Sequence, residues 1–203
     1  MFLVFEGIDG SGKETQVRLV VEKLKKLGHK VELLDFPDYS SEPGKKIGQY
    51  LNHEIEMPSD ELGKLYAEDR KLAMPRLKEW LKDGKIVVSD RYAYSNLAYQ
   101  LANGVDHDYL TALDKDLIFP EIVFFVDTDV EEVIKRMDAS RKKDKYESNM
   151  EYLKSVLDNY RKMCDGSIEV FGNAKWIKID GNKSIEEVEK DIWKYVEACL
   201  SEY

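Results

Sequence analysis

The 203-residue sequence predicts an α/β fold in which a five-stranded parallel sheet carries helices on both faces. Five short apolar runs alternate with longer, charged stretches of helical spacing, which is typical of strands joined by helical crossovers. A glycine-rich segment, GIDGSGK, stands between the first apolar run and the first helical stretch. Because no Pro/Gly/Ser-rich linker and no repeat interrupts the chain, we expect residues 1–203 to form a single domain.

The predicted strands are short and end at polar or turn-forming residues. They cover residues 2–7, 30–37, 85–90, 121–127 and 175–180. Ligands of a parallel sheet bind outside the carboxyl ends of its strands, so the residues after each strand are the candidates for a site. These are residues 7–15, 37–39, 90–100, 127–129 and 181–182.

The first and last helices are predicted from their apolar spacing. Gly28 is expected to close the first helix, and Ser184 with Glu187 predicts a capping box at the start of the last. The expected buried faces comprise Val17, Val20, Val21, Leu24 and Leu27 in the first helix, and Ile185, Val188, Ile192 and Val196 in the last.

Composition excludes several classes of protein. A net charge of −9 argues against a general nucleic-acid or membrane-surface binder, because either needs a basic face. The start MFLVFEG lacks a cationic region and is interpreted as a strand, with no signal peptide, and no stretch approaches membrane-spanning length. Cys164 and Cys199 lack metal-ligand spacing and are expected to be reduced thiols. A cytoplasmic protein is therefore expected.

The segment GIDGSGK matches the phosphate-loop pattern G-x-x-x-x-G-K between a strand and a helix. Its glycines let the backbone approach phosphate, and its N–H groups point inward at the helix N-terminus. A turn with a surface lysine is the alternative. Lys13 would bridge the transferred and leaving phosphates, and Asp9 is either a turn aspartate or a carboxylate aimed at the acceptor or at metal-bound water. The expected ATP-binding residues here are Gly7, Ile8, Asp9, Gly10, Ser11, Gly12, Lys13, Glu14 and Thr15.

A second motif, SDRYAYSNLAYQ, ends the third strand at residues 89–100. Asp90 could hold a metal ion through water, and the planar guanidinium of Arg91 could clamp a phosphate. Beyond them, aromatic and amide side chains follow along a helix start. The alternative is a structural Asp90–Arg91 ion pair with the tyrosines in the core.

The two motifs and four further segments make the sequence resemble the thymidylate kinases, which make dTDP from dTMP. The further segments are FPDY at 36–39, LYAEDR at 65–70, FPEIVFFVD at 119–127 and WIKIDGNKSIEEV at 176–188. The resemblance runs nearly end to end. It implies a P-loop NTPase-type three-layer sandwich with a small helical lid over about 136–153, the use of ATP and Mg²⁺, and a homodimer.

The resemblance also implies a dTMP site. Tyr66 would stack on thymine, Arg70 would bond a base carbonyl, Arg91 would hold the phosphate, and Phe36–Pro37 would form a cis-proline turn. The adenine of ATP would rest near Arg136 and residues 181–182. The implied dTMP-binding residues are Asp9, Pro37, Tyr39, Tyr66, Arg70, Arg91, Asn96, Tyr99 and Gln100.

Phosphoryl transfer needs positive charge at the transferring group. Some members of the family supply it from the lid, so Arg141 joins Lys13, Asp9 and Arg91 as an expected catalytic residue, with Arg136 as the alternative to Arg141. The alternative for the basic lid segment is a solvated helix face.

The resemblance breaks at Glu14, where the family has Ser or Thr. We expect Asp90 and Glu14 to hold the metal ion; the alternatives are that Asp90 and water hold it alone, or that Glu14 impairs the loop.

The leading hypothesis is an ATP- and magnesium-dependent dTMP kinase. The alternatives are a kinase for another pyrimidine nucleoside monophosphate and a catalytically impaired nucleotide-binding homologue. A GTPase-type switch is disfavoured because the segment NKSI at 182–185 lacks the aspartate of a guanine-reading motif.

Overall fold

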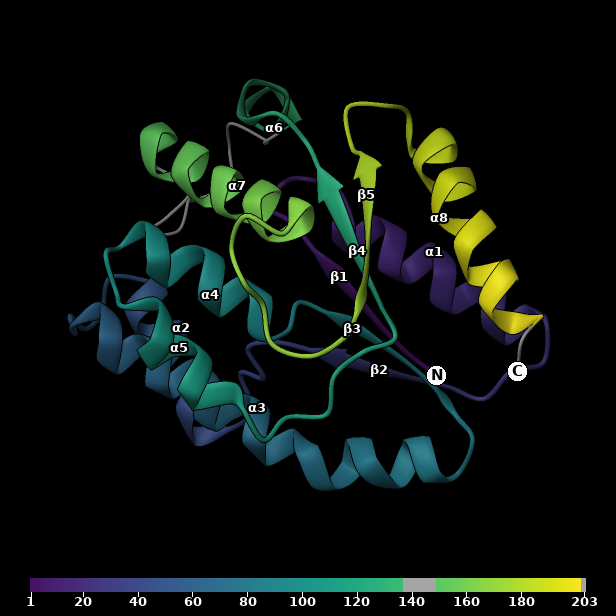
Figure 1. The fold of residues 1–203 in the computed structure, drawn as a ribbon, viewed down its shortest axis with the longest axis horizontal. Helices are drawn as coiled ribbons and strands as arrows, with labels where there is room; N and C mark the ends of the chain where they lie inside the picture. Colours follow the sequence, from purple (N-terminus) through teal and green to yellow (C-terminus); the bar gives the residue numbers. More distant parts are fainter. Residues whose placement is uncertain (137–148, 202–203) are drawn as a thin grey trace.

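The computed structural model describes residues 1–136 and 149–201, which form a parallel five-stranded sheet covered by helices on both faces (Figure 1). The strand order is β2-β3-β1-β4-β5. This arrangement confirms the predicted α/β three-layer fold. The strands are β1 (Phe2–Glu6), β2 (Val31–Asp35), β3 (Ile86–Asp90), β4 (Ile122–Asp127) and β5 (Lys175–Asp180).

Two hydrophobic layers flank the sheet because successive residues of each strand point to opposite faces. Along β1, Phe2 and Val4 enter one layer, whereas Leu3 and Phe5 enter the other. The second layer is closed by α1 (Lys13–Lys26) and α8 (Ile185–Leu200). The first and larger layer contains α2 (Glu42–Leu51), α3 (Ser59–Lys82), α4 (Ala93–Ala102), α5 (His107–Asp114) and α7 (Met150–Asp165). The short α6 (Val130–Arg136) follows the carboxyl end of β4.

The helix ends follow their sequence signals. Gly28 has φ +88° and closes α1, where the His29 N–H donates to the Leu24 carbonyl at 3.1 Å. Ser184 and Glu187 form the expected capping box of α8. Two predicted members of the buried faces are wrong, since Leu27 is 59% exposed and Ile185 is 54% exposed. Leu27 follows the last turn of α1 and Ile185 is the first residue of α8, so neither lies in a turn that packs on the sheet.

The carboxyl ends of the strands gather the segments that the sequence singled out. Asp90 at the end of β3 is in register with Phe5 of β1 and with Asp35 of β2. The loop 7–12, the turn after β2 and the start of α4 therefore meet at one edge of the sheet. Among the residues described, no helix is long and apolar enough to span a membrane.

Candidate active site

The loop between β1 and α1 has the backbone that a phosphate cradle requires. Gly7, Gly10 and Gly12 have φ values of +150°, +77° and +94°, which residues with a side chain rarely adopt. A Cβ atom on Gly7 would lie 2.8 Å from the Val126 carbonyl oxygen, so that position tolerates only glycine. The backbone thus curls into the N-terminus of α1, where N–H groups without helical partners favour an anion.

Helix α1 begins at Lys13, whose side chain is buried and whose Nζ lies 3.5 Å from the Asp9 carboxylate. Glu14 and Thr15 follow in the first turn, with Glu14 exposed and Thr15 half-buried. Lys13 is therefore held back toward the loop while Glu14 faces outward. The functions of these residues stay predictions.

Arg136, at the end of α6, lies beside the same loop. Its Nη1 donates to the Gly181 carbonyl at 2.9 Å and lies 4.0 Å from where a Cβ of Gly12 would stand. Its Nε also donates to Glu132 at 3.1 Å. The structure thus brings together the arginine, the residue 181 turn and the phosphate loop, as the predicted adenine site requires. Arg141, and with it residues 137–148 of the predicted lid, falls outside the described residues.

Arg91 and Asp9 form the centre of the site. The Arg91 Nη2 donates to Asp9 Oδ1 at 2.6 Å, and the Tyr99 hydroxyl donates to Asp9 Oδ2 at 3.0 Å. Burial would raise the pKa of Asp9, but the charges of Arg91 and Lys13 outweigh it and hold the pKa below its ordinary value. Burial and the Asp9 charge raise the pKa of Tyr99, so its hydroxyl remains a donor. Asp9 is therefore a fixed anion between two cations.

The backbone of Arg91 is strained, with φ +64° in the left-handed region. Such strain costs on the order of 1–3 kcal/mol in a residue with a side chain and persists where the surroundings enforce it. Here the Arg91 N–H donates to the Phe5 carbonyl at 2.9 Å and the Ser89 hydroxyl donates to the Arg91 carbonyl at 2.6 Å. These two hydrogen bonds hold the backbone of Arg91 in this conformation, in which its guanidinium contacts Asp9.

Glu6, which the sequence reasoning missed, anchors this segment from inside the protein. Its carboxylate is fully buried and accepts from the backbone N–H groups of Tyr92 and Ser95, at 2.9 and 3.1 Å. The hydroxyls of Ser95 and Tyr160 also donate to it, at 2.5 and 2.9 Å. Ser95 in turn accepts from Arg91 at 2.9 Å. Glu6 thereby ties the orientation of Arg91 to β1.

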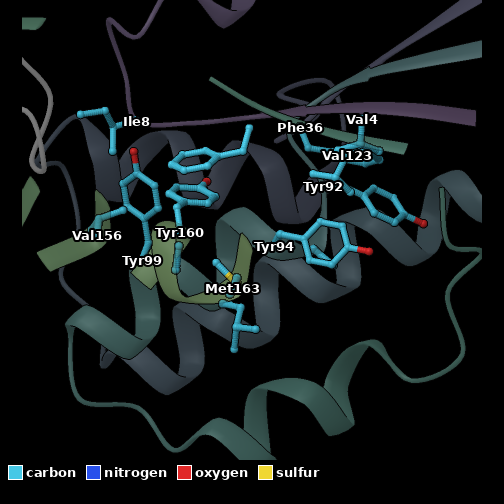
Figure 2. Close-up of a cluster of buried hydrophobic side chains, with 14 of the residues drawn as sticks. Val4, Ile8, Phe36, Tyr92, Tyr94, Tyr99, Val123, Val156, Tyr160 and Met163 are labelled. Atoms are coloured by element: carbon cyan, nitrogen blue, oxygen red, sulfur yellow. The ribbon is translucent and has the colours of Figure 1, made fainter. Parts of the chain in front are cut away.

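A pocket opens beside the Asp9–Arg91 pair. Together with adjoining open solvent it encloses about 460 Å³ of space. Seven of its nine lining residues belong to the predicted dTMP site, and Leu51 and Ser95 are additions. The lining comprises Asp9, Pro37, Tyr39, Leu51, Tyr66, Arg91, Ser95, Asn96 and Tyr99. Tyr99 of this lining also belongs to the aromatic core that contains Tyr92, Tyr94 and Tyr160 (Figure 2).

The other two residues of the predicted dTMP site, Arg70 and Gln100, are buried and do not line this pocket. The Arg70 guanidinium donates to both Asp114 oxygens, at 3.3 and 2.6 Å, and both side chains are 1% exposed. Within the described part of the chain, Asn96 Oδ1 and Gln100 Nε2 are buried and lack partners. Buried polar groups are normally bonded, so these two atoms, one helical turn apart on α4, suit the polar edge of a base.

The cis peptide bond expected at Phe36–Pro37 is confirmed. The turn that follows it is fixed by Asp69, the aspartate of LYAEDR. Asp69 accepts from the Asp38 N–H at 2.7 Å and from the Ser41 hydroxyl at 2.5 Å. Ser41 also caps α2 by accepting from the Gly44 N–H at 2.8 Å. Helix α3 thus fixes the segment that carries Pro37 and Tyr39 to the pocket.

The donor set near the loop fits a magnesium ion, which prefers hard oxygen ligands and keeps several waters. Asp90 is 9% exposed, and its Oδ1 is buried without a partner among residues 1–136 and 149–201. In that same part of the chain, no three His, Cys, Asp or Glu side chains lie close enough to ligate one ion together. A magnesium ion here would therefore keep most of its water shell, with Asp90 and Glu14 as the nearest candidates from the sequence.

The sequence offered unequal signals for these residues. Ser95 and Asp69 lie inside the motifs SDRYAYSNLAYQ and LYAEDR, but these motifs do not predict their contacts. Asp114 lies in a stretch without a motif, and its pairing with Arg70 spans 44 positions of the chain. Only the folded arrangement of α3 and α5 reveals it.

Comparisons with known proteins find relatives along almost the whole chain. Residues 5–192 match the family model described as thymidylate kinase. A probable thymidylate kinase of Thermococcus onnurineus is 36% identical, with 97% of each chain covered. The thymidylate kinase of Arabidopsis thaliana is 31% identical over 96% of this chain and 70% of its own. Among solved structures, the thymidylate kinase of Candida albicans, described as having broad substrate specificity, superposes with a TM-score of 0.85 at 26% identity, covering 98% of this chain and 92% of its own.

Proposed function

The chain belongs to the thymidylate kinase family and phosphorylates dTMP to dTDP, and we propose that ATP is the donor and Mg²⁺ the metal ion. The single observation that supports this best is the Asp9–Arg91–Tyr99 cluster, which stands between the phosphate loop and the pocket. A donor phosphate and an acceptor phosphate can both approach this cluster.

On the donor side, the loop residues 7–12 and the α1 N-terminus bind the phosphates of ATP through backbone N–H groups. Lys13 neutralises charge on the phosphate that is transferred. Arg136 and the turn at Gly181 bind the adenine. Mg²⁺, held by Asp90 and Glu14, supplies charge neutralisation at the phosphates when bound. Arg141 of the lid remains the further catalytic arginine that the sequence predicts.

On the acceptor side, Arg91 orients the dTMP phosphate with its forked guanidinium. Asp9 keeps that guanidinium and the Tyr99 hydroxyl in position. The acceptor is already an anion, so no residue has to form a covalent intermediate, and catalysis consists of positioning and charge stabilisation. Tyr99 faces the sugar and leaves little room for a ribose 2′-hydroxyl.

The base is selected by the residues along α3 and α4. Tyr66 stacks on thymine, which is worth about 1–3 kcal/mol but does not distinguish bases. Asn96, which lines the pocket, supplies the discrimination together with Gln100 one helical turn along α4. Arg70, which pairs with Asp114 outside the pocket lining, is the further base-reading residue that the resemblance implies. A pocket for one methyl group separates thymine from uracil by only about 1–3 kcal/mol. We therefore expect dUMP to be a slower substrate, not an excluded one.

The assembly and location are proposals of the same kind. We propose a cytoplasmic homodimer that binds no nucleic acid and no membrane, because the family resemblance implies a dimer and the net charge of −9 disfavours polyanionic partners.

A coupled ADP-release assay with ATP and MgCl₂ tests the proposal. It offers dTMP, dUMP, dCMP, UMP, dGMP and dAMP in turn, and the breadth described for the Candida albicans enzyme makes the purine acceptors informative. We expect fast turnover with dTMP, slower turnover with dUMP and little with the rest. A preference for dCMP or UMP would support the kinase for another pyrimidine instead.

Glu14→Ser is assayed beside the parent. If the turnover of Glu14→Ser depends on the magnesium concentration differently from that of the parent, Glu14 belongs to the metal site. Turnover by Glu14→Ser but not by the parent would show that Glu14 disables the loop and would favour the catalytically impaired homologue.

A further inference from the structure

Asp35 is a carboxylate at the sheet edge to which neither the sequence motifs nor the comparisons give a function. It is the last residue of β2 and is in register with Asp90, the last residue of β3. Register partners on neighbouring parallel strands point to the same face of a sheet. Two positions earlier, Val88 of β3 packs in the layer that α1 closes, so Asp90 and Asp35 project on the α1 face. Their carboxylates leave the sheet toward the first turn of α1.

Among residues 1–136 and 149–201, neither carboxylate forms an ion pair with a lysine or arginine. No hydrogen bond or ion pair joins the Asp35 side chain to another residue of the described ranges, and the buried Asp90 Oδ1 has no partner there. The nearby cations are already engaged, since Lys13 and Arg91 pair with Asp9 at 3.5 and 2.6 Å. A buried carboxylate oxygen without a donor is costly, which indicates a ligand at this position.

The electrostatic field at Asp35 agrees with this arrangement. Asp35 is an exposed residue of the sheet edge, but partial burial of its carboxylate and the charge of Asp90 raise its pKa above the ordinary value, and Glu14 adds to the increase, while Lys13 and Arg91 oppose it. Asp35, Asp90 and Glu14 therefore act on one small region in which negative charge is in excess. A divalent cation would relieve that excess.

We propose that Asp35 is a further residue of the metal site and that, with Asp90, it binds the water shell of a hydrated divalent cation beside Glu14. No three carboxylates in the described chain are close enough to ligate one ion directly. Magnesium gives up its waters reluctantly, and a protein commonly contributes only one or two carboxylates while the ion keeps several waters to which further carboxylates can bind. Asp35 is thus a positioning residue that acts through water and does not touch the reacting phosphates.

This inference rests on the proposed use of a metal ion, so its test must separate the two. The probe is Mn²⁺, whose binding is followed by electron paramagnetic resonance, in the presence of a non-hydrolysable ATP analogue. The variants are Asp35→Asn, which removes the charge at nearly constant shape, and Asp35→Glu, which keeps it. Glu32→Gln is the matched control because it removes a carboxylate from the same strand, where Glu32 pairs with Lys85 at 2.7 Å.

We expect Asp35→Asn to weaken Mn²⁺ binding about 10-fold, the lower end of the effect of removing a group that supports a metal site through other ligands. Glu32→Gln should stay within about twofold of the parent, because surface ion pairs contribute little. Asp35→Glu should recover most of the affinity. Equal Mn²⁺ affinity in Asp35→Asn and Glu32→Gln would overturn the proposal.

A second measurement distinguishes a metal function from a structural one. Without metal and with EDTA, Asp35→Asn should bind the ATP analogue as well as the parent or more tightly, because one negative charge near the phosphates is gone. A similar loss of analogue binding with and without metal would show that Asp35 only maintains the fold, and would overturn the proposal. If the parent does not phosphorylate dTMP, the proposed function is wrong, and the Mn²⁺ binding measurements still decide separately whether Asp35 belongs to the metal site.

Discussion

The two halves of the site are built differently. The donor half, loop 7–12 with the start of α1, binds mainly through backbone whose shape is set by glycines. The acceptor half consists of side chains from the loop after β1, the turn after β2, α2, α3, and α4 with the residues just before it. Partners distant in sequence fix the turn after β2 and Arg91. In this site the phosphate cradle therefore depends on local chain geometry, whereas the pocket for a base and sugar depends on side chains that only the fold brings together.

That comparison predicts that a single change beneath the acceptor half damages the whole fold. In Asp114→Asn, the buried Arg70 charge loses its partner, and breaking such a pair costs about 3–5 kcal/mol of unfolding free energy. Urea unfolding measures the loss. The control is Asp158→Asn, which removes an exposed partner of Lys162 and should cost less than about 1 kcal/mol. Equal losses would show that Arg70 is not held by Asp114.

A change in the donor half should instead damage turnover alone. Lys13→Met removes one fixed positive group from the transferring phosphate, and removal of one such group lowers kcat about 10²–10³-fold. The measurement is kcat for dTMP phosphorylation, with dTMP affinity from equilibrium binding. Lys23→Met, on the same helix and 40% exposed, is the control and should retain activity. A comparable fall in dTMP affinity would contradict the division into two halves.

Asp69→Asn should affect the acceptor half without touching the ligand. An amide has one neutral acceptor atom, so one of the two donors, the Asp38 N–H or the Ser41 hydroxyl, loses its acceptor and the other keeps an uncharged one. A bond to a charged group is worth about 1.5–3 kcal/mol, so KM for dTMP should rise about 10-fold or more while kcat changes little. Glu68→Gln, an exposed neighbour on α3, provides the control. An unchanged KM would mean that the turn after β2 holds its shape by itself.

The smallest expected effects are changes in the pH dependence of stability, and they arise from the carboxylates of Glu6 and Asp9. Burial raises the pKa of Glu6 above its ordinary value of 4.5, so its contribution to stability is present below that value and is lost as the pH rises through the raised pKa. The pKa of Asp9 is lowered from 3.8, so its contribution is present above that value and is lost as the pH falls. The stability advantage of the parent should therefore fall with rising pH against Glu6→Gln, and with falling pH against Asp9→Asn.

Denaturant unfolding from pH 3 to 8 measures both differences, each changing by at most about 1.4 kcal/mol per pH unit. If the stability difference between parent and variant changed with pH in the same direction for Glu6→Gln and Asp9→Asn, the pKa values of Glu6 and Asp9 would not be shifted in opposite directions.

The sequence by itself determined the parts of this protein that depend on local chain geometry. Alternating apolar runs predicted the five strands, and the glycine spacing predicted the loop that ends at Lys13. Capping residues predicted the ends of α1 and α8, because a cap involves residues only a few positions apart. The motif resemblance also supplied seven of the nine residues that line the pocket.

Only the tertiary structure decided which side chains support the site. The local sequence does not predict that Glu6 accepts four hydrogen bonds from Tyr92, Ser95 and Tyr160. It also does not predict that Asp114 pairs with Arg70. Asp35 and Asp90 become neighbours because β2 and β3 pair in one particular register. Such contacts join residues that are 44 to 154 positions apart. Their energies depend on burial and register, which are properties of the packed sheet and helices and not of any short segment.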